Sequence, residues 1–277
     1  MREPVLVPPA GGEVIGDVPD RRVEILSDDE RLNATWSRFG PRREGADLHV
    51  HRHHTDCFYV LAGELTVRLG LEDERVTVSA GTLARVPPLV VHGFLNGSDA
   101  ELRYLNFHAP GQRFADYLRA TRDGRSFTYD QHEPPEDGGR PASEAVVGGA
   151  VAVIDRPGLR VELLADVEEI GISETRCRPG ALPALPHRQG RHVESLYVLE
   201  GELALTVGER ELRVTTGTWA QVLPGVTHTI GPAGAGDVRF LELRTPSCDY
   251  GAFLRELHDA RMDEEVACDH EHERGIG

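Results

Sequence analysis

Residues 49–64 read HVHRHHTDCFYVLAGE, and the same outline returns at residues 187–202 as HRQGRHVESLYVLEGE. In the first stretch, His49 and His51 are two residues apart, so on an extended strand their imidazoles leave the same face. Asp56 then opens an apolar run that ends in a glycine turn. Imidazoles on one face beside a carboxylate are typical of a divalent metal site.

A third imidazole must come from another part of the chain. His92, in the stretch RVPPLVVHGFLN, is the candidate. His53 and His54 compete with it as ligands if the strand contains a bulge at that point. The sequence therefore predicts a histidine-rich metal site in the first half of the chain.

The outline shared by the two stretches extends over most of the chain. An offset of 138 residues pairs His49 with His187, and after the next turn an offset of 136 residues pairs His92 with His228. The change of offset predicts a hairpin that is two residues shorter in the second copy. A match of this length indicates an internal repeat whose period is one whole domain.

Each copy has the pattern of short strands. Leu65, Val67 and Leu69 alternate with polar residues, which is the period of a half-buried strand. Glycine and proline recur at the intervals of an antiparallel barrel or sandwich. A helical stretch closes each copy, at 113–122 and at 249–262, with apolar residues spaced to pack on a sheet. We therefore predict an all-β fold of two tandem barrels with short flanking helices.

The domain organisation follows from the repeat and from composition. Between the copies the chain is rich in proline, glycine and acidic residues, which is typical of a linker or a lid. The expected parts are an N-terminal barrel at 10–122, a linker at 123–147, a C-terminal barrel at 148–262 and a polar tail at 263–277.

Composition excludes several classes of function. The 277 residues carry 46 acidic and 30 basic side chains, a net charge of -16, which disfavours binding to nucleic acid or to anionic membranes. All the basic residues are arginine, so lysine Schiff-base chemistry and a P-loop are excluded. Four widely spaced cysteines, a short apolar N-terminal stretch and no long apolar run predict a cytoplasmic protein with a small-molecule substrate.

The two motifs, in this order, resemble those of the cupin superfamily, and the resemblance covers nearly the whole chain, once per half. In that family, a His-x-His pair is followed by a glutamate and a glycine, and a second motif supplies another histidine. Leu89 stands where the second motif has a glycine. The first copy supplies, in order, His49, His51, Asp56 and Gly63 for one motif, and Gly81, Pro87, His92 and Asn96 for the other.

This resemblance implies two jelly-roll barrels, also described as double-stranded β-helices, and a divalent transition metal in the first. The ligands it implies are His49, His51, Asp56 and His92. Asp56 is one methylene shorter than the family's glutamate, so a three-histidine site with a loosely held carboxylate is expected. The metal is one ion per chain of iron, nickel, manganese, cobalt or zinc, because histidine-rich sites accept several of these ions.

The second copy departs further from the motif. Gln189 stands where an imidazole is expected, and glutamine is a weak ligand for transition metals. A weak second metal site and a metal-free pocket are both open alternatives, and His192 lies close enough to substitute as a ligand. The four corresponding residues are His187, Gln189, Glu194 and His228.

Strand alternation puts Phe58 and Val60 on the same side as Asp56, and Phe94 on the same side as His92. These residues form either an apolar pocket wall or plain barrel core. Resemblance to two-domain cupins of the quercetin dioxygenase type implies a metal-dependent dioxygenase for a small aromatic or enolic substrate, with Asp56 as ligand or base. The alternatives are a non-redox isomerase, lyase or decarboxylase, or a non-catalytic binding protein. The chain is expected to be a monomer or a homodimer.

Overall fold

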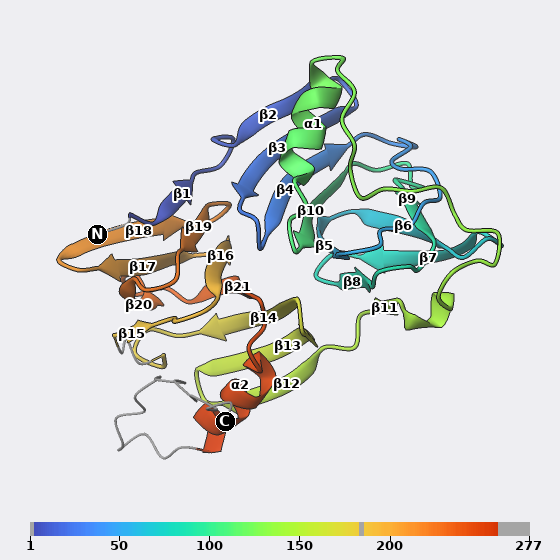
Figure 1. The fold of residues 1–277 in the computed structure, drawn as a ribbon. Helices are drawn as coiled ribbons and strands as arrows, with labels where there is room; N and C mark the ends of the chain where they lie inside the picture. The colour runs from blue at the N-terminus through green and yellow to red at the C-terminus, as the bar shows by residue number, and fades with distance from the viewer. Residues whose placement is uncertain (1–2, 183–185, 260–277) are drawn as a thin grey trace, which may run out of the picture. The chain divides into compact units, whose positions relative to one another are not determined.

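The structure is a computed structural model that describes residues 3–182 and 186–259. Its contacts divide the chain into two compact units, which are traced in Figure 1. One unit spans residues 12–149. The described part of the other joins residues 3–11 to residues from 150 onward. The segment at 123–147, between the two copies of the repeat, therefore lies within the first unit.

The first unit consists of two antiparallel sheets and one α-helix. Its elements are β2 (Glu13–Val18), β3 (Arg21–Asp28), β4 (Asn33–Phe39), β5 (Thr55–Ala62), β6 (Glu64–Leu69), β7 (Glu74–Ser79), β8 (Leu83–Val86), β9 (His92–Leu95), β10 (Leu102–Ala109), α1 (Phe114–Arg122), a 3-10 turn (Ala142–Glu144) and β11 (Val146–Val147). The larger sheet has the order β11-β8-β5-β10-β4-β3-β2, and the smaller has the order β7-β6-β9.

The second unit has the same construction. Its elements are β1 (Val5–Val7), β12 (Val151–Arg156), β13 (Leu159–Val167), β14 (Ile170–Cys177), β15 (His187–Arg188), β16 (Val193–Glu200), β17 (Glu202–Val207), β18 (Arg210–Thr215), β19 (Trp219–Val222), β20 (Thr227–Pro232), β21 (Val238–Thr245) and α2 (Tyr250–Asp259). The larger sheet has the order β1-β19-β16-β21-β14-β13-β12, and the smaller has the order β15-β20-β17-β18.

The two units repeat one strand order, so the predicted all-β fold of two tandem barrels with short flanking helices is confirmed. The hairpin between β6 and β7 has its turn at residues 70–73, whereas the one between β17 and β18 has its turn at residues 208–209. This confirms the shorter hairpin in the second copy. A short strand covers the same sheet edge in each unit, since β11 pairs with β8 and β1 pairs with β19.

Alternation along β6 builds the interior of the first unit. Leu65, Val67 and Leu69 are buried, while the polar residues between them are partly exposed. Phe58 and Val60 on β5 belong to the same buried apolar cluster. The predicted period-two pattern is therefore the pattern of burial.

The helices are short and pack on the outer strands of their own units. Helix α1 buries Leu118 against a cluster that includes Val23 and Ile25 of β3, and it lies along β2 and β3 in Figure 1. Helix α2 is described as far as Asp259, and the rest of the predicted helix and the tail, with His270 and His272, lie outside the described residues. Among the described residues, no helix combines the length and the apolar character that a bilayer crossing requires.

Replacing Leu65 with alanine is expected to destabilise the first unit by about 2–5 kcal/mol, because the side chain is fully buried and its removal leaves a cavity. Denaturant unfolding of Leu65→Ala measures this loss. Leu71→Ala is the control, since Leu71 is 47% exposed and its loss should change the free energy of unfolding by less than about 0.5 kcal/mol. Equal midpoints for the two variants would contradict this description of the core.

Candidate metal centre

Three histidines of the first unit meet inside the barrel. His49 and His51 precede β5, and His92 begins β9. The backbones of His49 and His92 are joined by two hydrogen bonds, in which each N–H donates to the other's carbonyl, at 2.8 and 2.9 Å. All three side chains are buried, and their ring nitrogens lie within 4.8 Å of one another. The structure therefore brings together the three imidazoles that the motif spacing selected.

Each of these rings is held by a backbone carbonyl on its Nδ1 side. Nδ1 of His49 lies 2.7 Å from the carbonyl oxygen of Asp47, and Nδ1 of His92 lies 2.9 Å from that of Val90. Nδ1 of His51 lies 2.5 Å from the carbonyl oxygen of Asp130. A carbonyl only accepts, so each Nδ1 carries the proton and each neutral ring presents a lone pair at Nε2.

The Nε2 atoms of His49 and His51 are 3.1 Å apart. With both protons on Nδ1, two lone pairs face each other, which is unfavourable unless a cation lies between them. Two nitrogens bound at about 2.1 Å and at right angles to one ion lie about 3.0 Å apart. Backbone carbonyls that fix the distal nitrogen are the usual outer partners of metal-binding histidines. The donor set therefore fits a divalent transition metal.

Asp56 adds a buried carboxylate to this group. Its Oδ2 lies 3.4 Å from Nε2 of His92 and 3.7 Å from Nε2 of His51. Its Oδ1 accepts a hydrogen bond from the side-chain amide of Asn106 at 2.5 Å. Asp56 therefore stands beside the ring nitrogens, at the place that the motif gives to a carboxylate.

The two histidines considered as competing ligands have different environments. His53 is exposed, whereas His54 is fully buried, with its ring centroid 3.9 Å from that of His51. Nε2 of His54 lies 3.0 Å from Nδ1 of His108. His54, His51 and His108 thus form a second group of close ring nitrogens next to the first. A lone histidine such as His108 gives no motif signal, and the sequence alone did not select it.

Asp130, which lies in the segment between the two copies, holds the backbone and the histidines around the first site. Its carboxylate accepts from the backbone N–H groups of Arg52 and His53 at 2.8–3.1 Å, and from Nδ1 of His54 at 3.0 Å. Its backbone carbonyl holds His51. Burial would raise the pKa of Asp130, but His54 and the two backbone amides lower it further than burial raises it. The stretch that composition marks as a linker therefore supplies part of the site.

The second unit holds a related but different group. His187, Glu194 and His228 form a close cluster, with Oε2 of Glu194 3.4 Å from Nε2 of His187 and 3.2 Å from Nε2 of His228. Gln189 donates to the same oxygen at 2.8 Å. His192 is buried nearby, but it is not in this cluster. Glutamine therefore binds the carboxylate where the first unit offers a third imidazole.

The predicted pocket residues lie in the apolar interior. Phe58 and Val60 are fully buried, and Phe94 packs on Phe58 with ring centroids 5.0 Å apart. They share one apolar cluster. Their role as a substrate wall stays a prediction.

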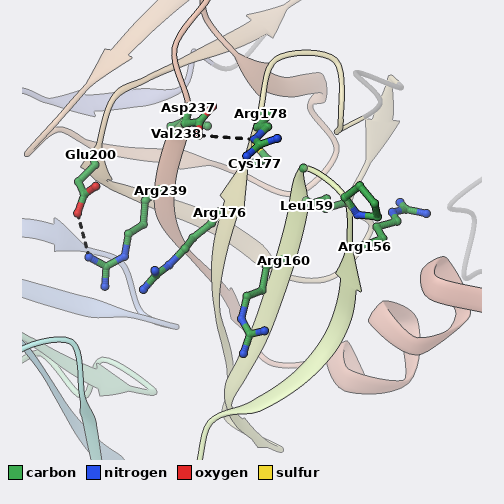
Figure 2. A pocket seen from close by; sticks show the side chains of 12 residues that line it. Arg156, Leu159, Arg160, Arg176, Cys177, Arg178, Glu200, Asp237, Val238 and Arg239 are labelled. Atoms are coloured by element: carbon green, nitrogen blue, oxygen red, sulfur yellow. Dashed lines mark hydrogen bonds and ion pairs between the residues drawn. The ribbon is translucent and has the colours of Figure 1, made fainter.

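Arginines line a surface cavity of about 420 Å³ in the second unit, shown in Figure 2. Arg176 and Arg239 are both bound to Glu174, at 3.1 and 2.7 Å, and Arg239 also contacts Glu200. In the first unit, Arg38 stands at the repeat position of Arg176 and contacts Glu101 at 3.7 Å. These arginines are paired with carboxylates on the outer face, and the cavity is lined by none of the clustered histidines.

The metal-free protein is expected to lose stability as the pH falls from about 6.5. Burial and the neighbouring His92 and His51 lower the pKa of His49 to about 3, whereas an imidazole in the unfolded chain titrates near 6.5. Between these values the unfolded state binds a proton that the folded state excludes, so acid favours unfolding. Denaturant unfolding at pH 7, 6 and 5 should show a smaller loss for His49→Gln than for the wild type. Equal losses would contradict a buried neutral His49.

Placing an imidazole at position 189 should strengthen metal binding at the cluster of the second unit. Gln189→His is expected to raise bound metal by up to about one equivalent, because imidazole is a better ligand than an amide. Elemental analysis after loading and desalting measures this. Arg188→His is the control, since it adds a histidine at an exposed neighbouring position. An equal rise in both variants would indicate adventitious binding.

Comparison with known proteins supports this architecture. The cupin domain model matches residues 35–108 and 174–244. No curated protein sequence matches the chain. Similar solved structures include an oxalate decarboxylase mutant from Bacillus subtilis, with a TM-score of 0.59, 16% identity, and coverage of 87% of this chain and 76% of that one.

Two further structures have the same fold. The oxalate decarboxylase formate complex from Lactobacillus farciminis has a TM-score of 0.60 and 15% identity, and the match covers 87% of this chain and 86% of that one. The protein Ylba from E. coli has a TM-score of 0.61 and 13% identity, with coverage of 89% and 92%. The family model matches both halves at the strands that carry the histidine clusters, so this chain belongs to the cupin domain family, with one cupin domain in each half.

Proposed function

We propose that the first unit is the active site of a metal-dependent enzyme that acts on a small carboxylic acid without redox change, as a decarboxylase, another lyase or an isomerase. The observation that carries this proposal is the convergence of Nε2 lone pairs from His49, His51 and His92 beside the buried side chain of Asp56. His49, His51 and His92 would hold the ion, with Asp56 as a further ligand or as the base.

A divalent ion bound there supplies a Lewis acid that polarises a substrate oxygen. The residues suit iron, nickel, manganese, cobalt or zinc, since imidazole nitrogen binds all of these ions. A second ion at His187, Glu194 and His228 would be bound more weakly, because Gln189 replaces an imidazole.

The surroundings of the first site favour a small polar substrate. The buried side chains beside the ligands are polar, namely His54, Asn106, His108 and Tyr129. They make the surroundings of the ligands polar and leave little apolar surface for an aromatic ring. The structures of similar fold include oxalate decarboxylases, and oxalate is a small dicarboxylate.

These features support the non-redox alternative better than the dioxygenase hypothesis. That hypothesis relied on an apolar wall of Phe58, Val60 and Phe94 for an aromatic or enolic substrate. These three side chains pack into the barrel's apolar cluster together with Leu65 and Val67. A small-molecule substrate is common to both hypotheses, and the cytoplasmic location and the choice between monomer and homodimer stay predictions.

Asp56 is suited to accept and return a proton. Its carboxyl group is buried and held by the amide of Asn106, so its position does not depend on solvent. His108 approaches the same oxygen at 3.5 Å. A base that is fixed beside the ligands needs no rearrangement before it takes a proton from the substrate.

The reaction class is tested with protein stripped of metal and reloaded with Mn²⁺ or Zn²⁺. Oxalate, malonate and oxaloacetate are supplied without dioxygen, and released carbon dioxide is measured. Turnover in the absence of oxygen that is lost in His92→Ala would support the proposal. Strict dependence on dioxygen, with oxygen consumed, would overturn it in favour of the dioxygenase.

Asp56→Asn is expected to slow turnover by about 10²–10⁴-fold, because the amide cannot accept the proton. The kcat on the active substrate measures this, and bound metal is quantified in the same samples. Asp47→Asn is the matched control, since the side chain of Asp47 is exposed. A kcat near the wild-type value in Asp56→Asn would remove Asp56 from the chemistry.

A further inference from the structure

A second set of ligand atoms converges next to the first site, and the cupin motifs do not include it. Nε2 of His54 lies 3.0 Å from Nδ1 of His108. The hydroxyl oxygen of Tyr129 lies 2.6 Å from Nδ1 of His108 and 3.1 Å from Nε2 of His54. All three side chains are buried, at 0%, 3% and 7% exposure for His54, His108 and Tyr129. The two nitrogens and the oxygen therefore form a triangle that is shielded from solvent.

The hydrogen bonds around the triangle fix the protons of both rings. The amide nitrogen of Asn106 donates to Asp56 and to the carbonyl of Cys57, so the amide oxygen of Asn106 faces His108. Nε2 of His108 lies 2.9 Å from that oxygen and therefore carries its proton. Nδ1 of His54 donates to the ionised Asp130. Both neutral rings consequently turn a lone pair toward the centre of the triangle.

Only the hydroxyl hydrogen of Tyr129 remains to bond with the lone pairs of the two rings. The hydroxyl of Tyr129 donates to either Nδ1 of His108 or Nε2 of His54, but not to both. The other nitrogen is then a buried acceptor that faces a second acceptor at 3.0 Å. A buried polar atom without a partner costs about 1–3 kcal/mol. A cation bound to all three atoms would satisfy them.

The geometry points to a second metal site, in which Nε2 of His54, Nδ1 of His108 and the oxygen of Tyr129 bind a divalent first-row transition ion. On binding, the ion replaces the phenol hydrogen: the oxygen–hydrogen bond of Tyr129 breaks, the proton leaves to solvent, and the oxygen keeps the electron pair that it shares with the metal. Separations of 2.6–3.1 Å bring the three ligand atoms close enough together to bind one ion.

The outer contacts support this assignment. Asp130 holds the distal nitrogen of His54 and Asn106 holds that of His108, as carboxylates and amides do around metal-binding histidines. Phe114 stacks on the ring of His108, with centroids 3.8 Å apart and planes 13° from parallel. Both rings are therefore fixed before any ion binds.

The second copy carries a fixed cation at the equivalent place. Arg244 stands at the position of His108 in the repeat, and Glu242 stands at that of Asn106. The Arg244 side chain is buried, bonds to Glu242 at 2.9 Å and lies over the ring of Tyr250 at 4.3 Å. In the second copy, a residue with a permanent positive charge thus stands at the repeat position of His108, which we assign as a metal ligand in the first.

Copper titration of metal-free full-length protein tests the site, because copper bound to a tyrosinate oxygen has a charge-transfer absorption band that copper bound only to imidazoles lacks. Tyr129→Phe should bind one equivalent of Cu²⁺ less than the wild type, lack this band and release one proton fewer in weakly buffered solution. Tyr117→Phe is the matched control, since the ring of Tyr117 stacks on that of Tyr129 at 5.0 Å and its hydroxyl is outside the triangle. It should behave as the wild type does.

Two further variants keep the sites distinguishable. His92→Ala should lose a different equivalent of copper and keep the band, because it changes only the first site. His54→Gln should lose the band, as Tyr129→Phe does, while circular dichroism shows that both variants are folded. The proposal is overturned if folded Tyr129→Phe matches the wild type in copper content and spectrum, or if no band appears in the wild type. Either result would mean that a proton alone occupies the triangle.

Discussion

The candidate site depends on one repeated interaction, the hydrogen bond from an imidazole Nδ1–H to a backbone carbonyl. It fixes His49, His51 and His92 in the tautomer that presents Nε2, and two of the three carbonyls come from the histidine's own strand region. Buried imidazoles without such bonds would be free to turn the protonated nitrogen inward and offer no lone pair. The barrel positions these carbonyls through the paired backbones of His49 and His92.

The two copies show how little must change for such a site to diverge. Leu89 donates its N–H to the carbonyl of His51, and Gly225 makes the same bond to Gln189. Both residues have a positive φ, which glycine adopts freely and leucine does not. The first copy keeps this turn in spite of the unfavourable residue. The turn that bonds to this residue is therefore present in both copies, although the residue is histidine in the first copy and glutamine in the second.

Much of the fold could be predicted from strand alternation and from the internal repeat, and the three histidines of the first site from the two motifs that resemble those of cupins. The alternation of Leu65, Val67 and Leu69 depends only on neighbours in the chain, and the repeat is visible when the two halves are compared. Asn106 and His108 lie inside a buried strand, where their polarity was the only available signal.

The contribution of Tyr129 and Asp130 could not be predicted. Their segment has no periodic pattern, and its proline and glycine content is typical of a linker. They reach the site through contacts with His51 and His54, which are more than 70 positions away. Such tertiary contacts leave no trace in local composition, since they depend on where the barrel closes.

The bonds of Asp130 have a consequence for where the first domain can be separated from the rest of the chain. The repeat ends before residue 123, but Asp130 lies in the segment that follows it. Its carboxylate binds Arg52, His53 and His54, so the first domain needs a part that lies beyond the repeat. A fragment cut at the end of the repeat would lack the acceptor of these bonds, whereas one that runs to residue 149 would keep it.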